Sequence, residues 1–326
     1  MNFVSLCYHY IRNVSNNHYP RILGTSASDF CDQVNELTVQ FPAISLQDIF
    51  SSWEAGEPHV YSEPRLLFTF DDGLKDHLMA GEILASKGIS GVFFIPTCIL
   101  MDGAPANPMI IHYGLAIHGL EAFLNCYRHA LENYCLNVAK YDVEFQRGVT
   151  DPWEAIREIK QKIKYVLHSS EARNVLLFVY SELLRVGDED ILSKIHLSVK
   201  DVMMLVEMGH EIGTHSHTHL SVAASELSAS KFDDEILKPR IYLEDLVDRS
   251  VSALSYPFGG AKDCYSADAL KPDQTGYRCA FTVAPKLNLA RSDRFSLGRF
   301  MPHSTDTVAS LREVLTKMSN ANGAPV

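Results

Sequence analysis

Hydrophobic and polar positions along this chain alternate between two patterns. Uninterrupted apolar runs such as residues 65–70 (RLLFTF) and 90–97 (SGVFFIPT) are rich in β-branched and aromatic residues, which predicts strands buried on both faces. Between them, residues 77–88 (HLMAGEILASKG) have a helical pattern that ends at a glycine, a common helix stop. This strand–helix–strand spacing is what a parallel sheet with helical crossovers requires.

The same alternation extends over most of the sequence. It predicts further strands over 3–11, 251–260, 277–283 and 295–303, and helices over 26–37, 198–209, 225–247 and 305–318. Ser26 and Ser198 stand where helix N-caps are expected. The predicted fold class is therefore α/β.

Residues 101–197 interrupt the alternation with one helical pattern after another. The clearest is 151–167, where Asp151 is the expected cap, Pro152 the first helical residue, and Glu154 the acidic residue three positions after the cap. Because strands resume afterwards, we interpret 101–197 as a helical insertion in a single domain spanning residues 1–326. It would act as a cap over a site or as a dimer contact, or be an inert elaboration.

Composition and charge exclude several classes of protein. The 326 residues are 46% hydrophobic and 21% charged, and the formal net charge is −11. This acidic balance argues against nucleic acid or an anionic membrane surface as the main partner. No run approaches the roughly 18 apolar residues of a membrane span, and the N-terminal sequence does not resemble a signal peptide. The seven scattered cysteines fit reduced thiols, so we expect a cytoplasmic protein.

Two adjacent carboxylates, Asp71 and Asp72, follow the predicted strand 65–70. The carboxyl edge of a parallel sheet is where α/β folds place ligands. Two carboxylates this close raise each other's pKa unless a cation or a proton lies between them. A loop with helix-capping aspartates is the structural alternative.

Three histidines occur within five positions in residues 214–219 (THSHTH). His215 and His219 are four apart, a spacing that brings two imidazoles to one side of a helical turn and is common in metal sites. His217 would then face away. Chance clustering among 14 histidines is the alternative.

Residues 255–260 (SYPFGG) form a third candidate element, with Tyr256, Pro257 and Phe258 at the end of a predicted strand. Glycines there allow a ligand to approach backbone N–H groups, although a simple turn has the same composition. Two histidines and one carboxylate with open positions would make a catalytic metal site. A second carboxylate beside them could act as a general base toward water, which is the plan of a hydrolase.

The ordered set FTFDDG, HEIGTHSHTH, SYPFG and LGRF resembles the polysaccharide deacetylase family, the NodB-homology carbohydrate esterases. SLCYHYI, GISGVFFIPT and GYRCAFTV also resemble strands of that family, so the resemblance covers nearly the whole chain except the insertion. The resemblance implies a distorted (β/α) barrel with fewer than eight strands.

The resemblance also implies roles for individual residues. Asp71 would be the general base, and Asp72, His215 and His219 would bind a divalent metal, usually zinc, although related enzymes accept other transition metals. The metal would polarise the carbonyl of an N-acetyl group and bind the attacking water. The backbone N–H of Phe258 would help to hold the oxyanion.

Two departures from the family pattern concern the base and the acid. Many members carry an arginine that orients the base at the position where this chain has Ser255. Arg299 in LGRF would orient the base here instead. The family's general-acid histidine sits in an LLHD-like strand that is absent here. His303 is our nearest substitute, and His9 is a second histidine that would face the cleft.

The sequence therefore predicts a metal-dependent N-deacetylase. Its substrate would be an N-acetylated amino sugar, either a small molecule or an oligosaccharide, and the cytoplasmic location favours a nucleotide- or lipid-linked intermediate of surface glycan synthesis. Hydrolysis of another C–N bond on the same fold and a non-catalytic metal- or carbohydrate-binding relative are the alternatives. A homo-oligomer is also possible.

Overall fold

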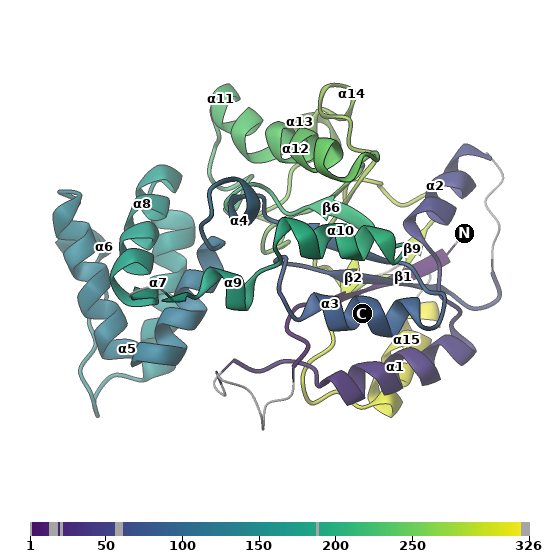
Figure 1. The fold of residues 1–326 in the computed structure, drawn as a ribbon, viewed down its shortest axis with the longest axis horizontal. Coiled ribbons are helices and arrows are strands. Elements are labelled where there is room, and N and C mark those ends of the chain that lie inside the picture. Colours follow the sequence, from purple (N-terminus) through teal and green to yellow (C-terminus); the bar gives the residue numbers. More distant parts are fainter. Residues whose placement is uncertain (1, 13–18, 20–21, 56–60, 187–188, 321–326) are drawn as a thin grey trace.

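The computed structural model describes residues 2–12, 19, 22–55, 61–186 and 189–320. Its centre is a parallel sheet of seven strands in the order β10-β1-β2-β3-β6-β7-β8, and a short strand, β9, pairs antiparallel with β1 (Figure 1). The strands are β1 (Asn2–Tyr8), β2 (Arg65–Phe70), β3 (Gly91–Ile95), β6 (Glu211–Thr214), β7 (Ala253–Ser255), β8 (Cys279–Phe281), β9 (Asn288–Leu289) and β10 (Arg299–Phe300).

The sheet curls into a nearly closed barrel. Its last strand, β8, meets the segment that leads into β10 through a parallel bridge between Phe281 and Leu297. The N–H of Arg299 also donates to the carbonyl of Ala284 at 3.0 Å. The expectation of an α/β protein built as a distorted barrel with fewer than eight strands is confirmed.

Strand β2 shows why these segments form the barrel. Leu66, Phe68 and Phe70 belong to the large core under the helices, whereas Leu67 belongs to a second core with inward-facing residues of neighbouring strands. The ring of Phe70 stacks on that of Phe93 in β3, with centroids 4.5 Å apart. A strand that is apolar on both sides must be covered on both, and in this barrel helices cover the outer face and side chains of other strands the inner one.

The predicted helices flank the barrel. Helix α1 (Ala27–Gln40) begins at the predicted cap Ser26, whose Oγ accepts from the N–H of Asp29. Ser198 and Asp201 form a capping box at the start of α10 (Val199–Glu207). Three flanking helices have no counterpart among the predicted elements: α2 (Leu46–Glu54), α13 (Ala267–Leu270) and α14 (Pro272–Thr275). The other flanking helices are α3 (His77–Ala85), α11 (Ala229–Phe232), α12 (Lys238–Val247) and α15 (Val308–Asn320).

The predicted helical insertion lies between β3 and β6 and forms a lobe beside the barrel (Figure 1). Asp151 caps α7 as predicted, through Trp153. The lobe and its connections comprise α4 (Cys98–Met101), α5 (Asn107–Asn133), α6 (Val138–Tyr141), α7 (Pro152–Gln161), α8 (Ser169–Val179) and α9 (Leu192–Ile195), with a short hairpin of β4 (Arg185–Val186) and β5 (Glu189–Asp190). Among the described residues, no helix combines the length and the apolar character needed to cross a bilayer.

Candidate active site

Asp71 and Asp72 occupy the carboxyl end of β2. The N–H of Asp71 donates to the carbonyl of Tyr8 at 3.0 Å, which extends the β1–β2 ladder by one bond. The chain then turns sharply, because Asp72 has φ 77° and Gly73 has φ 55°, values that are uncommon outside glycine. The φ of Gly73 favours glycine at this turn, and a Cβ there would also lie 2.9 Å from Cδ1 of Ile99. Both carboxylates line one cavity.

Arg299 neutralises Asp71 across the barrel. Its Nη1 donates to Oδ1 of Asp71 at 2.8 Å and its Nη2 donates to Oδ2 at 2.7 Å. Ser255 links the two, since its hydroxyl accepts from Arg299 at 2.8 Å and donates to Asp71 at 3.1 Å. Burial alone would raise the pKa of Asp71, but the charge of Arg299 and its hydrogen bonds outweigh burial and hold that pKa well below its ordinary value. Asp71 is therefore ionised at neutral pH.

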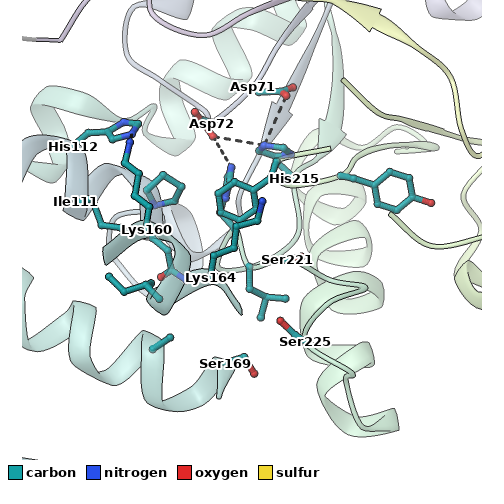
Figure 2. Close-up of a pocket in the computed structure, with 18 of the residues that line it drawn as sticks. Asp71, Asp72, Ile111, His112, Lys160, Lys164, Ser169, His215, Ser221 and Ser225 are labelled. Carbon is teal, nitrogen blue, oxygen red and sulfur yellow. Dashed lines mark hydrogen bonds and ion pairs between the residues drawn. The ribbon is translucent and has the colours of Figure 1, made fainter. Parts of the chain in front are cut away.

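Asp72, His215 and His219 converge beside this pair. Oδ1 of Asp72 lies 3.6 Å from Nε2 of His215 and 3.0 Å from Nε2 of His219 (Figure 2). One ligand atom from each of the three residues lies within 4.8 Å of the others, and all three side chains are buried. The structure thus brings together the three residues that the sequence analysis assigned to metal binding.

The chemistry of these three residues, which we call the metal cluster, fits the binding of one metal ion. Nδ1 of His215 donates to the carbonyl of Ser255 at 2.7 Å, so its Nε2 presents a lone pair to Asp72. Burial lowers the pKa of His215 to about 4, which keeps the ring neutral. Oδ1 of Asp72 is buried and accepts no hydrogen bond from the described residues, an arrangement that is costly without a cation. Two imidazoles and one carboxylate are ligands that zinc and related transition metals accept.

The two histidines are not brought together by a helical turn, which corrects that prediction. Residues 215–219 are irregular: Ser216 has φ 56° and His219 has φ 62°, and the N–H of His219 donates to Oγ of Ser216 at 3.1 Å. The ring centroids of His215 and His219 are 4.5 Å apart. As predicted, His217 faces elsewhere, with its Nε2 3.0 Å from Asp102.

The turn after β7 forms another wall of the site. Tyr256 is buried and donates its hydroxyl to the carbonyl of Tyr265. After Pro257, Phe258 has φ 65°, and its ring meets that of His219 edge-on at 4.8 Å. Within the described part of the chain, no acceptor takes a hydrogen bond from the N–H of Phe258. This N–H is therefore available to a ligand.

Part of the chain matches a family of known proteins. Residues 151–279 match the family model described as polysaccharide deacetylase. This part of the chain is similar to polysaccharide deacetylase domains, the family that the sequence motifs resemble. The matched range includes both metal-cluster histidines and the SYPFGG turn, whereas Asp71 and Asp72 lie before it. No curated protein matches the sequence.

Several solved structures share the fold. The Streptococcus pyogenes deacetylase PplD in complex with acetate is 13% identical with a TM-score of 0.58, over 97% of this chain and 98% of that one. IcaB from Ammonifex degensii is 14% identical with a TM-score of 0.54, over 96% and 97%. A de-N-acetylase from Aggregatibacter actinomycetemcomitans is 13% identical with a TM-score of 0.55, over 96% and 100%. At such identities the likeness is one of fold.

The two histidines that the sequence analysis considered as the general acid lie in different positions. Nε2 of His9 is 3.9 Å from Oδ2 of Asp72, and its half-buried ring lines the cavity that contains the metal cluster. His303 is exposed, lines a neighbouring cavity, and donates its backbone N–H to Asp306. His303 does not line the cavity of the metal cluster.

Asp263 is a site residue that the sequence analysis missed. It is 2% exposed, and its Oδ2 accepts from the N–H of Gly260 and pairs with Nζ of Lys164 at 3.0 Å. Its Oδ1 accepts from the hydroxyls of Ser221 and Tyr165 at 2.5 and 3.2 Å. One carboxylate thus ties the helical lobe to the turn that carries Phe258. No local motif marks Asp263, so only the assembled fold reveals this role.

The helical lobe supplies much of the cavity, which has a volume of about 380 Å³. Two basic residues of the lobe, Lys160 and Lys164, line it together with His112 (Figure 2). The apolar part of the wall consists of Pro108, Ile111, Ile163, Ala172, Leu220, Val283 and Met301. Helical periodicity placed the lobe residues among these on helices but could not show which helix faces meet the barrel.

Proposed function

We propose that this protein hydrolyses the N-acetyl group of an amino sugar with the help of a divalent metal ion. The observation that carries the proposal is the pairing of a buried cluster of Asp72, His215 and His219 with a second carboxylate, Asp71, held ionised by Arg299. A site that only bound metal would have no use for Asp71. When bound, a zinc ion or a related transition metal would supply a Lewis acid for the amide carbonyl.

Asp71 is the proposed general base. Its Oδ2 lies 3.8 Å from Nε2 of His215, so a water molecule at the metal cluster would be within reach of the carboxylate. Arg299 and Ser255 orient Asp71 through three hydrogen bonds. Proton transfer to Asp71 would leave the water oxygen free to attack the amide carbon.

The backbone N–H of Phe258 is the proposed oxyanion donor. It has no partner among the described residues, and its peptide lies beside His219 because the Phe258 ring packs on that imidazole. A donor fixed by backbone geometry stabilises the developing charge on the carbonyl oxygen without reorganising. Tyr256 and Pro257 would shape the adjoining wall.

We propose His9, rather than His303, as the acid that protonates the leaving amine. His9 lines the cavity of the metal cluster, with its Nε2 3.9 Å from Asp72, whereas His303 is exposed in an adjoining cavity, whose wall also includes His9 and Asp72. The acid must reach the nitrogen of the same amide that the base-activated water attacks. The cytoplasmic location, the glycan-synthesis intermediate and the homo-oligomer stay predictions, as does the possible dimer contact of the helical lobe.

Acetate release tests the proposal. The purified chain, reconstituted with zinc or cobalt, should release acetate from N-acetylated sugars, and excess chelator should stop the reaction. Asp71→Asn should abolish turnover while the bound metal per chain remains unchanged. Asp306→Asn, a carboxylate near the barrel but outside the cavity, is the control and should keep its activity. If Asp71→Asn releases acetate at the wild-type rate, the assignment of the base is wrong.

A further inference from the structure

The cavity contains a positively charged group that the deacetylation chemistry does not use. Nζ of Lys160, on α7, lies 3.2 Å from Nε2 of His112, on α5, and both residues line the cavity with the metal cluster (Figure 2). Among the described residues, no carboxylate lies within ion-pair distance of Lys160. By contrast, the other lysine of the cavity, Lys164, is paired with Asp263.

His112 positions Lys160 without neutralising it. Burial and the charge of Lys160 lower the pKa of His112 to about 3, so the imidazole is neutral and its Nε2 accepts from the ammonium group. Nδ1 of His112 is 3.1 Å from the hydroxyl of Tyr10, which fixes the ring from its other side. A neutral acceptor leaves the positive charge of Lys160 uncompensated, and its two remaining N–H groups have no acceptor among the described residues, so a ligand can take them.

The placement of this charge contrasts with the rest of the chain. The protein has a formal net charge of −11, which repels anions at long range. Of the two carboxylates that line the cavity, Asp71 is paired with Arg299, and Asp72 belongs to the metal cluster. An uncompensated ammonium group is therefore the main feature of the lobe-side wall that can attract an anion. Lysine acts on phosphate as a point charge.

We propose that Lys160, positioned by His112, binds a phosphate group of the substrate, so that the preferred substrate is an amino sugar carrying a phosphate near its N-acetyl group. The inference rests on the proposed deacetylase function and adds a substrate class to it. The phosphate can come from a sugar nucleotide or from a lipid-linked sugar, since both offer the same anionic group. The apolar residues beside Lys160 can accommodate the rest of either molecule, the nucleotide or the lipid.

Acetate release from three types of substrate tests the inference. These are uncharged chitotetraose, UDP-N-acetylglucosamine, and polyprenyl-phosphate-linked N-acetylglucosamine in detergent micelles. The wild-type protein should prefer at least one phosphorylated substrate in kcat/KM, and the one preferred identifies the source. Lys160→Met should lower that kcat/KM about tenfold to a hundredfold, because it removes one hydrogen bond between charged groups, and leave chitotetraose unaffected.

Lys162→Met is the matched control. Lys162 lies two residues away but does not line the cavity, since its Nζ contacts Glu158 and the carbonyl of Asp142. This variant should retain the wild-type preference. The inference would be overturned if the wild type had equal kcat/KM for charged and uncharged substrates, or if Lys160→Met changed both equally. Neither outcome would contradict the deacetylase function.

A binding measurement separates the two proposals. Glucose 1-phosphate carries no acetyl group, so calorimetry can report its binding even if no substrate is hydrolysed. Binding should be about tenfold or more weaker to Lys160→Met than to the wild type or Lys162→Met. No acetate release from any substrate would reject the deacetylase function. No binding, or binding that does not depend on Lys160, would reject the phosphate site.

Discussion

Replacing Arg299 with methionine would leave the carboxylate of Asp71 buried without its counter-charge. Arg299 makes two charged hydrogen bonds to Asp71, at 2.8 and 2.7 Å. The two side chains are only 0% and 3% exposed, so water cannot replace the lost partner. Removing one member of a buried ion pair costs about 3–5 kcal/mol, because the remaining charge stays desolvated. We expect the free energy of unfolding near neutral pH to fall by this amount.

The loss of stability should depend on pH in a defined direction. In the wild type, the pKa of Asp71 is below that of the unfolded chain, about 4, so the pair stabilises the fold above that pH and loses its effect as the pH falls toward the folded pKa. In the variant, burial raises the pKa of Asp71 instead. Protonation then relieves the buried charge, so the difference in unfolding free energy between the two proteins should narrow toward acid pH.

Urea unfolding followed by circular dichroism measures this difference at neutral and at mildly acid pH. Excess chelator keeps metal binding from contributing to either protein. Arg291→Met, an exposed arginine in the same C-terminal segment, is the control and should change the unfolding free energy by less than about 0.5 kcal/mol. The reasoning would be refuted if the unfolding free energy of Arg299→Met lay within about 1 kcal/mol of the wild-type value at neutral pH. It would also be refuted if the difference in unfolding free energy between the two proteins were the same at both pH values.

Three further predictions concern the metal, the buried histidines and Asp263. His219→Ala should remove most of the bound metal, measured by elemental analysis, whereas His217→Ala, whose ring faces Asp102, should keep it; equal metal contents would contradict this. Burial lowers the pKa of His77 to about 4, below the unfolded value of about 6.5, so the stability of the protein should fall as the pH drops below about 6.5. In His77→Gln, the urea midpoint should fall less steeply with pH. Asp263→Ala should lower kcat about tenfold or more with metal content unchanged, because the Phe258 turn loses its anchor; unchanged kcat would dismiss that role.

The strands and capped helices were the most predictable part of the fold. Residues 65–70 were predicted as a strand and β2 has the same bounds, because a strand buried on both faces must be continuously apolar. Ser26, Asp151 and Ser198 cap the helices they were expected to cap, since N-capping depends on residues only two or three positions apart. Such local rules can be applied to the sequence alone.

Helix α2 and the turn at 215–219 were harder to predict. Ser45 and Asp48 form a capping box at the start of α2, a local signal that was present in the sequence but did not enter the prediction. The spacing of His215 and His219 is that of a helical turn, yet two residues with positive φ bring the rings together. Spacing therefore identified the pair of ligands without specifying the backbone that holds them.

The sequence by itself identified the two carboxylates and the two histidines of the site. Asp71 and Asp72 end a strand and the two histidines follow another, and parallel strands present their carboxyl ends at one edge. Only the tertiary structure decided which groups become partners. Arg299 reaches Asp71 across 228 positions because the barrel nearly closes, and Lys160 faces His112 because two lobe helices pack beside the cavity. Contacts between such distant residues leave no local pattern, so their energies are set by packing rather than by sequence spacing.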